Sequence, residues 1–174
     1  MNLQLETQRL ILRPIQVSDA QDLFEMDNNP NVHLYLGNEP VQTIDEVYGY
    51  IENIQNQYIK NGIGRFVIVV KETNEMIGWA GIKFVTEPEN NRVNFYDLGY
   101  RLKESHWRKG YAFEAAKAWL EYGFNQMKID VMIATAHVDN VGSNTILQKI
   151  GMQQKETYLH HDLPCHWYEL QNPN

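Results

Sequence analysis

The sequence has a single cysteine, no long apolar run and no surplus of basic residues. Cys165 stands alone among 174 residues, so no intramolecular disulfide can form and a reducing compartment is expected. No stretch approaches the roughly 18 apolar residues of a membrane span, and the first residues carry charges instead of an apolar signal segment. The sequence therefore predicts a cytoplasmic protein without a membrane partner.

The charge balance argues against a nucleic-acid partner. Lys and Arg number 15 against 22 Asp and Glu, a net charge of −7, whereas binding to the phosphate backbone needs surplus positive charge. A cationic small substrate or a basic peptide fits this balance better. Neither G-x-x-x-x-G-K-[ST] nor the glycine spacing of a dinucleotide-binding turn occurs.

The composition and the hydrophobic pattern predict one α/β domain spanning residues 1–174. The hydrophobic fraction of 43% is ordinary, and no repeat or linker interrupts the chain. Capping boxes at Ser18/Gln21 and Thr43/Glu46 predict helices over 19–28 and 44–61, the second ended by Gly62. Strands are expected over 5–15, 65–70, 76–84, 93–102, 130–138, 152–159 and 165–171, and further helices over 109–125 and 139–151. This order predicts a mixed sheet, with a turn at Pro164 between the last two strands.

A basic turn at the start of the third long helix, "SHWRKGYAFEA" (105–115), predicts an anion site. A helix N-terminus presents amide N–H groups without intrahelical partners and a partial positive charge. Gly110 allows close backbone approach, and Arg108 and Lys109 add full charges, which together suit a phosphate or pyrophosphate. The alternative is that these basic side chains simply face water.

The order of motifs around this turn resembles the GNAT superfamily of acyl-CoA-dependent N-acetyltransferases. The motifs are "LETQRLILRPIQVSDAQDLF", "MIGWAGI", "DLGYRL", "KGYAFEA" and "DNVGSNTILQKIGM", covering roughly residues 3–160. The T-x-R-L-x-L-R opening is similar to that of the RimJ/RimL-like branch. The resemblance implies a mostly antiparallel mixed sheet flanked by helices, a splayed parallel strand pair that holds the cofactor, and acetyl-CoA as cosubstrate without a metal.

The resemblance also implies which residues hold the coenzyme. Backbone amides of the turn would bind the pyrophosphate, the end of the preceding strand would pair with the pantetheine arm, and a residue of the opposite wall would hydrogen-bond that arm. The turn residues are Arg108, Lys109, Gly110, Tyr111 and Ala112. The strand residues are Tyr100, Arg101 and Leu102, and the residue of the opposite wall is Asn140. The sequence departs from the family pattern where Trp107 replaces a Gln or Arg and Arg108 replaces a glycine. We expect the Arg108 side chain to reach a phosphate.

Two residues are candidates for the chemistry. Asp97 is expected to act as the general base, directly or through a water, the alternative being a solvated or ion-paired strand carboxylate. Ser143 is expected to donate to the coenzyme sulfur, the alternative being a serine that satisfies local amides. Leu147 occupies the position at which many GNAT enzymes carry a tyrosine acid. Glu114 is interpreted as a structural hydrogen-bond partner.

The acceptor side is predicted less specifically. Tyr35, Tyr48 and His137 are candidates to line the acceptor pocket, with packing as the alternative for His137. Some of the histidines in "HHDLPCHW" (160–167) are expected at its entrance; their spacing fits no standard zinc site. Cys165 has no context of an acyl-carrying nucleophile.

The leading hypothesis is therefore an acetyl-CoA-dependent N-acetyltransferase that works by direct attack in a ternary complex. The acceptor would be a small-molecule amine or a protein N-terminus, and the protein a monomer or a homodimer. The alternatives are a coenzyme A-binding module without turnover and a structural protein without coenzyme binding.

Overall fold

The computed structural model describes residues 3–173. Its strands form one eight-stranded sheet in the order β1-β2-β3-β4-β5-β6-β8-β7. All neighbouring strands are antiparallel except β5 and β6, which are parallel. The strands are β1 Leu5–Glu6, β2 Leu10–Pro14, β3 Arg65–Val70, β4 Met76–Val85, β5 Phe95–Leu102, β6 Val131–His137, β7 Gln153–His160 and β8 Leu163–Gln171. The mixed sheet and its parallel pair confirm the predicted fold class.

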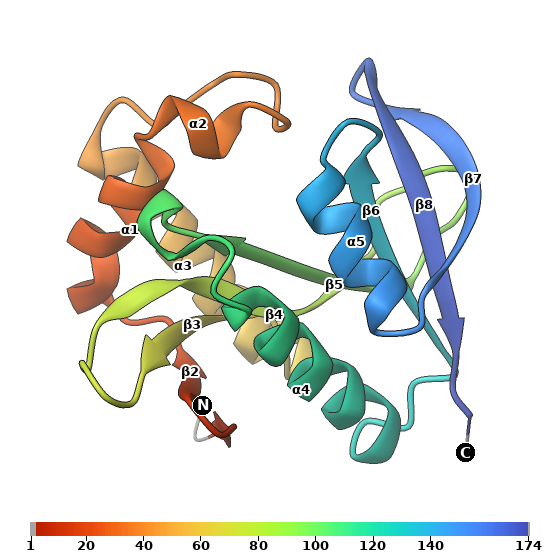
Figure 1. The fold of residues 1–174 in the computed structure, drawn as a ribbon, viewed down its shortest axis with the longest axis horizontal. Coiled ribbons are helices and arrows are strands. Elements are labelled where there is room, and N and C mark those ends of the chain that lie inside the picture. Colours follow the sequence, from red (N-terminus) through yellow and green to blue (C-terminus); the bar gives the residue numbers. More distant parts are fainter. Residues whose placement is uncertain (1–2, 174) are drawn as a thin grey trace.

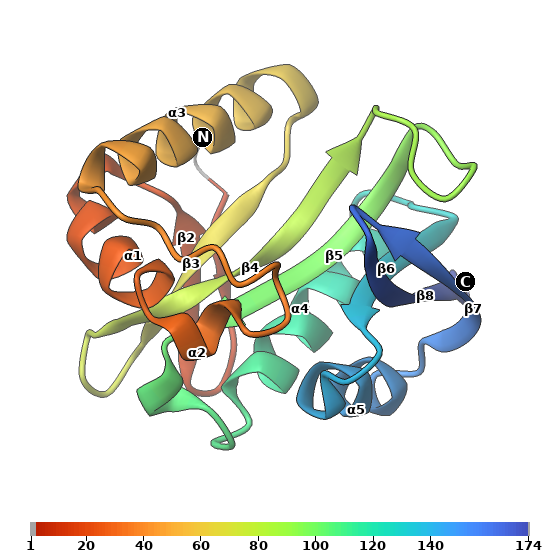
Figure 2. The same ribbon diagram turned by 90° about the horizontal axis from the view of Figure 1, so that it is seen from above.

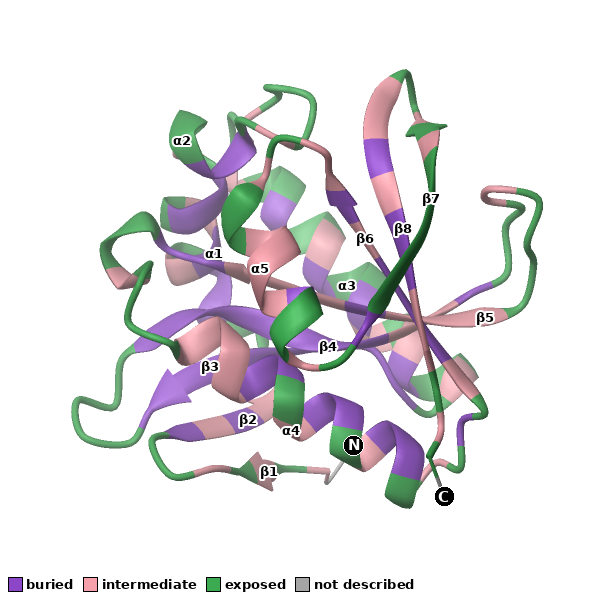
Figure 3. Ribbon diagram, turned by 45° about the vertical axis from the view of Figure 1, so that its right-hand side comes forward, coloured by how far each residue is buried: buried purple, intermediate pink, exposed green. Residues whose placement is uncertain are grey.

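Helices cover both faces of this sheet (Figure 1). They are α1 Ala20–Asp27, α2 Pro30–His33, α3 Ile44–Asn61, α4 Tyr111–Asn125 and α5 Val141–Lys149, with short 3-10 turns η1 Val17–Asp19 and η2 Glu104–His106. Figure 2 shows α1, α2 and α3 on one face and α4 and α5 on the other. The central strand β3 is buried along its whole length, whereas the edge strand β7 is mostly exposed (Figure 3). The core thus lies on both faces of the central strands.

The ends of α3 form as the sequence predicts. The backbone N–H of Thr43 donates to the Glu46 carboxylate at 2.9 Å, completing the predicted capping box. Gly62 ends the helix at φ +69°, in the left-handed region that favours glycine. One apolar face of the helix points inward: Val47, Ile51, Ile54 and Tyr58 are buried, and Ile44 is partly buried.

The N-terminal segment differs from the prediction of one strand over 5–15. It forms two short strands, β1 and β2, that pair with each other. The Thr7 backbone N–H donates to the Leu10 carbonyl, and the Leu10 N–H donates to Thr7 Oγ1, both at 3.0 Å. This local turn reverses the chain, and Arg9 lies within it.

The first helix is capped two residues earlier than predicted. The Gln16 backbone N–H donates to Asp19 Oδ2 at 2.8 Å, and Asp19 also accepts from Arg13. This capping box opens η1, and α1 follows from Ala20, so Ser18 does not act as the cap. The ion pair with Arg13 holds the Asp19 carboxylate where it can also accept from the Gln16 N–H. Within α1, Leu23 is fully buried, whereas Phe24 is only partly buried.

One other boundary was predicted wrongly, and one helix was missed. The turn between β7 and β8 lies at His161–Asp162, where both residues have positive φ, and Pro164 lies inside β8. A two-residue hairpin turn needs left-handed backbone, which proline cannot adopt. The short helix α2 was not predicted, although Asn29 followed by Pro30 is a typical N-cap and first-turn pair.

Candidate active site

A cleft opens where the two parallel strands separate. β5 and β6 pair only at Tyr96–Met132 and Asp97–Ile133, although both strands continue beyond these pairs. From there they diverge, as Figure 1 shows, and leave a cleft of about 1370 Å³ bounded by α2, α4 and α5. Strand backbone that faces this opening lacks a neighbouring strand, so an extended ligand can take that place.

The backbone of β5 offers specific groups to the cleft. The Lys103 N–H, just after β5, donates to the carbonyl of Ile77 in β4 at 2.8 Å. Because backbone groups of successive residues point to opposite sides of a strand, Leu102 and Tyr100 direct theirs to the open side and Arg101 toward β4. The indole N–H of Trp107 donates to the Leu102 carbonyl at 2.9 Å, which holds the start of the turn against the strand end.

The basic turn connects this strand to α4 through two left-handed residues. Arg108 has φ +60° and Gly110 has φ +80°, and α4 begins at Tyr111. The helix was predicted from Lys109; it starts later because the left-handed backbone of Gly110 is not helical. The first amides of α4 therefore point out of the helix at the edge of the cleft, beside the exposed Arg108.

Arg9 fastens this turn from the other end of the chain. Its Nη1 donates to the Lys109 carbonyl at 3.0 Å, its Nε donates to Glu114 Oε2 at 2.6 Å, and its guanidinium lies 4.5 Å from the centre of the Tyr111 ring. Glu114 also accepts from the Thr7 hydroxyl at 2.6 Å and from the Arg9 backbone N–H at 2.8 Å. Glu114 is thus engaged as a structural partner, as interpreted from the sequence.

The ionisation of Glu114 reflects these contacts. Partial burial raises its pKa, but the hydrogen bonds from Thr7 and Arg9 and the charge of Arg9 outweigh that effect. The net result is a pKa below the usual range of a glutamate. Glu114 therefore stays ionised at neutral pH and holds Arg9 in place.

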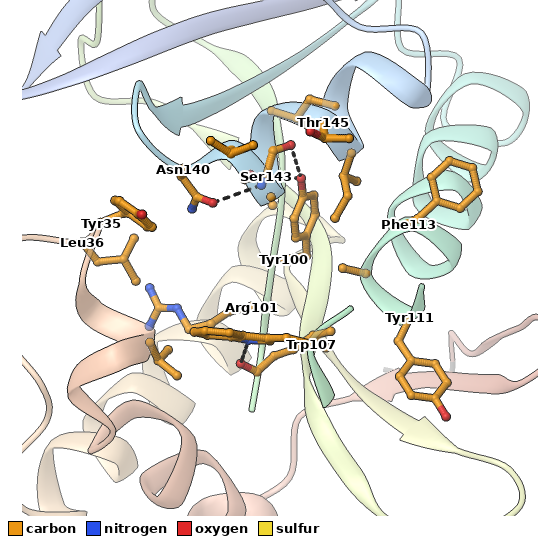
Figure 4. A pocket seen from close by; sticks show the side chains of 18 of the residues that line it. Tyr35, Leu36, Tyr100, Arg101, Trp107, Tyr111, Phe113, Asn140, Ser143 and Thr145 are labelled. Atoms are coloured by element: carbon orange, nitrogen blue, oxygen red, sulfur yellow. Dashed lines mark hydrogen bonds between the residues drawn. The ribbon is translucent and has the colours of Figure 1, made fainter. Parts of the chain in front are cut away.

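The opposite wall of the cleft comes from the first turn of α5. Asn140 caps this helix: its Oδ1 accepts from the Ser143 backbone N–H at 3.0 Å (Figure 4). The Tyr100 hydroxyl spans the cleft from β5, donating to the Ser143 carbonyl at 3.1 Å and lying 3.0 Å from Ser143 Oγ. Burial raises the pKa of Tyr100 well above that of a free tyrosine, so the phenol remains protonated. Leu147 is buried on the same helix and presents no hydroxyl.

Asp97 lies on the floor of the cleft and is paired with an arginine. Its Oδ2 accepts from Arg65 Nη2, and Arg65 also donates to the backbone carbonyls of Asp97 and Gly81. The alternative of an ion-paired strand carboxylate is therefore realised. The carboxylate still faces the cleft, with 18% of its side chain exposed.

The structure brings most of the predicted site residues together. Those that line the cleft are Tyr35, Asp97, Tyr100, Arg101, Leu102, Arg108, Gly110, Tyr111, Ala112, Asn140 and Ser143. Lys109, Tyr48 and His137 are not among the lining residues. Tyr48 is an exposed residue of α3, whereas His137 packs against Tyr35 with ring centres 5.4 Å apart.

The terminal histidines lie elsewhere. His160 contacts Glu89 at 3.0 Å, and His166 is within hydrogen-bond distance of Thr157 and Gln154, both at 2.9 Å. None of His160, His161 and His166 lines the cleft. Within residues 3–173 no group of three or more His, Cys, Asp or Glu is arranged to hold a metal ion. Burial raises the pKa of the Cys165 thiol, which disfavours a thiolate there.

Sequence reasoning missed Trp79 and Arg65 on the floor of the cleft near Asp97, and it named Arg101 only for its backbone. Trp79 and Arg101 are cross-strand partners on β4 and β5, and Arg65 comes from β3. Both guanidinium groups lie 5.2 Å from the Trp79 ring centre. Only the strand register reveals this cluster, which the separate motifs "RFVIVV", "MIGWAGI" and "LGYRL" do not show.

No helix within residues 3–173 has the length and hydropathy of a membrane span.

Comparison with known proteins agrees with this geometry. Residues 9–153 match the family model described as acetyltransferase (GNAT) domain. The chain is 31% identical to the uncharacterized N-acetyltransferase p20 of Bacillus licheniformis, over 87% of this chain and 83% of that protein. It is 33% identical to the uncharacterized N-acetyltransferase YoaA of Bacillus subtilis, again over 87% and 83%.

A solved structure gives the same fold. The ribosomal L7/L12 α-N-protein acetyltransferase RimL in complex with coenzyme A has a TM-score of 0.82 at 18% identity, covering 97% of this chain and 98% of that one. At this identity the likeness shows the fold alone. With the family model and the two relatives, the splayed strands and the basic helix turn lead to one conclusion: this chain belongs to the GNAT acetyltransferase family.

Proposed function

We propose that this protein is an acetyl-CoA-dependent N-acetyltransferase of the RimJ/RimL-like branch that acetylates a primary amine by direct attack in a ternary complex. The observation that carries the proposal is the continuity of the cleft. It runs from the splayed backbone of β5 to the open N-terminus of α4, which places a strand-like slot beside an anion site. A pantetheine arm ending in a diphosphate needs these two features in this order.

The residues present fit the coenzyme. Amides of the turn from Arg108 to Ala112 would bind the diphosphate, where the left-handed Gly110 keeps the backbone open and a side-chain Cβ would meet Arg9 at 3.3 Å. The backbone groups of Tyr100 and Leu102 would pair with the pantetheine. The coenzyme supplies a thioester-activated acetyl group, and this chain orients it and manages protons.

The acceptor must lose a proton before it attacks. An α-amine with a reference pKa near 8 costs about 1.4 kcal/mol to deprotonate at pH 7, whereas a lysine near 10.4 costs about 4.6 kcal/mol. A modest base therefore suffices for an α-amine. Asp97 is proposed for this role, directly or through a water, with Arg65 fixing its orientation.

The departing thiolate needs only a hydrogen-bond donor. A thiol has a reference pKa near 8.5, so its anion leaves without a strong acid. Ser143 is proposed as the donor, in contact with a Tyr100 phenol that stays protonated. Leu147 in the place of a tyrosine acid favours a second candidate, a module that binds acyl-CoA without turnover.

A thiol-release assay over small amines and N-terminal peptides separates these candidates. We expect transfer to at least one class of amine, with Asp97→Asn and Ser143→Ala each lowering kcat about tenfold or more. Two exposed residues outside the cleft, Asp162 and Ser18, offer matched controls as Asp162→Asn and Ser18→Ala. Tight binding of acetyl-CoA without turnover over the whole panel would support the non-catalytic module instead. Full activity of both cleft variants would overturn the two residue roles.

A further inference from the structure

The acceptor side of the cleft has a tryptophan held between two arginines. Trp79 faces Arg65 and Arg101, each guanidinium 5.2 Å from its ring centre. Arg101 donates from Nη1 to Asp27 Oδ1 at 2.7 Å, and 24% of its side chain remains exposed. Figure 4 shows its guanidinium reaching toward Tyr35 and Leu36, across the cleft from α5. The side chain therefore lies where an acceptor molecule would enter.

Arg101 and Trp79 have hydrogen-bond donors without partners in the protein. Within residues 3–173, Nη1 of Arg101 is its one guanidinium nitrogen with a hydrogen-bond partner. The indole N–H of Trp79, which lines the cleft, is buried and unpartnered within the same range. A buried donor without a partner is costly, and at the wall of a cleft a ligand can supply the missing acceptor.

Arg65, the second arginine, leaves few hydrogen-bond donors for a ligand. Arg65 is engaged by Asp97 and by two backbone carbonyls, and it lies flat over Gly99, within 2.7 Å of where a Cβ would be. Gly99 separates Asp97 from Arg101 on the same face of β5. The two side chains thus mark the ends of one surface, about 13 Å apart along the strand backbone, with Asp97 at the proposed amine end.

We propose that the acceptor is a small amine that also carries a carboxylate, which Arg101 binds while the amine faces Asp97. Guanidinium–carboxylate hydrogen bonds are the strong, charge-assisted kind, and Arg101 can hold Asp27 with one edge and the ligand with the other. The Trp79 N–H supplies a further donor. This inference rests on the proposed transferase function and names its substrate class.

The test compares amino carboxylates with their carboxamides under saturating acetyl-CoA. The panel holds α-amino acids, longer ω-amino carboxylates, a peptide that begins with each α-amino acid, and polyamines. Rates are corrected for the fraction of free amine, because an amide lowers the amine pKa. We expect kcat/KM to favour the best carboxylate over its carboxamide at least about tenfold.

Variants then test whether the residues on the floor of the cleft cause this preference for a carboxylate. Arg101→Gln combined with Asp27→Asn avoids leaving a buried unpaired carboxylate, and it should reduce the preference to less than about threefold. Trp79→Phe keeps an aromatic ring and removes only the donor, so it should raise KM for the carboxylate several-fold and leave KM for the carboxamide unchanged. Arg92→Gln, at an exposed arginine outside the cleft, is the matched control and should keep the full preference.

Several outcomes would overturn the inference. These are equal rates for an amino acid and its carboxamide or peptide, faster transfer to polyamines, no carboxylate accepted, or a preference that survives in both Trp79→Phe and the double variant. If the double variant does not fold, Trp79→Phe decides. Stabilisation by acetyl-CoA is measured alongside. A wild-type protein that acetyl-CoA fails to stabilise would contradict the proposed function itself, whereas stabilisation without carboxylate preference contradicts only the substrate class.

Discussion

Arg108 combines backbone strain with a functional position. It has φ +60°, a left-handed conformation in which a side-chain Cβ costs about 1–2 kcal/mol, and it lines the cleft. A glycine would relieve that strain. We predict that the Arg108 side chain contributes to coenzyme binding.

Arg108→Gly should raise stability and lower coenzyme affinity. We expect a gain of about 1 kcal/mol, or about 2–4 °C in melting temperature for a chain of this size, and a several-fold weaker Kd for acetyl-CoA by calorimetry. Lys128→Gly is a matched control, because Lys128 is a basic residue at φ +56° away from the cleft. It should gain similar stability without any change in Kd. Unchanged affinity in Arg108→Gly would exclude the proposed phosphate contact.

Residue roles were predictable where local geometry decides them. The structural role of Glu114 follows from its place one turn into the helix, and the structure has it. The helix start was predicted two residues too early, because the sequence does not show that Gly110 is left-handed. The pairing of Asp97 with Arg65 depends on three strands coming together, so no local pattern shows it. The same holds for the unpartnered donor of Trp79.

At the scale of elements, the turn between β1 and β2 positions the start of α4. Arg9 lies in that turn and contacts the Lys109 carbonyl and Glu114, about 100 residues away. The T-x-R-L motif thus has a physical reason: its threonine and arginine hold the turn before α4 in place. The motif was visible in the sequence, but its partner on α4 was not.

Arg9→Ala should loosen this turn. Because 42% of the Arg9 side chain is exposed, we expect a stability loss of about 1 kcal/mol or less. The Kd for acetyl-CoA should rise several-fold, since the turn must then be ordered on binding. Lys117→Gln removes an exposed pair with Glu121 on the same helix and should change neither quantity. An Arg9→Ala protein with wild-type Kd would show that the turn holds its shape alone.

A second link joins the loop between β4 and β5 to the C-terminal hairpin. The hydrogen bond that His160 donates to the Glu89 carboxylate raises the pKa of His160, and the same bond lowers the pKa of Glu89. His160 contributes stability that is fully present below its unfolded pKa near 6.5 and is lost as pH rises through its raised folded value. Glu89 contributes stability that is present above its unfolded pKa near 4.3 and is lost as pH falls through its lowered folded value.

Hydrogen exchange of residues 86–94 should therefore be slowest between these limits. After correction for the intrinsic pH dependence, protection should fall when the pH rises above the folded pKa of His160. His160→Asn should remove that dependence, and His161→Asn should retain it, since His161 lies in the left-handed hairpin turn that asparagine tolerates. Equal pH profiles in the wild type and His160→Asn would contradict the link.

Element boundaries show what sequence patterns can and cannot fix. The capping box and final glycine of α3 are complete within its own segment, so both ends were predicted correctly. The box at Ser18 was wrong because Asp19 is recruited by Arg13, a residue of β2. The predicted N-terminal strand is two strands, because a turn at Thr7 separates them. The alternating hydrophobic pattern does not show this turn.

At the scale of the whole molecule, the net charge and the side chains of the cleft floor favour ligand groups of opposite charge. The net charge of −7 favours a cationic acceptor, whereas the floor beside Asp97 presents surplus donors from Arg101 and Trp79. An amine that carries a carboxylate reconciles both, because its cationic end is attracted by the overall field and its anionic end by the floor. The sheet order, which no single motif contains, brings these groups together.

The central claim is that the splayed strands and the α4 turn bind acetyl-CoA, and thermal unfolding tests it most directly. At about 100 times Kd, the ligand should stabilise the wild type by about 2.7 kcal/mol, or roughly 5–10 °C. Gly110→Glu adds a negatively charged side chain to the turn, with its Cβ 3.3 Å from Arg9, and should abolish the shift. Gly62→Glu substitutes an equally left-handed glycine at the end of α3, far from the cleft, and should keep it. No stabilisation of the wild type at millimolar acetyl-CoA, or an undiminished shift in Gly110→Glu, would contradict the account.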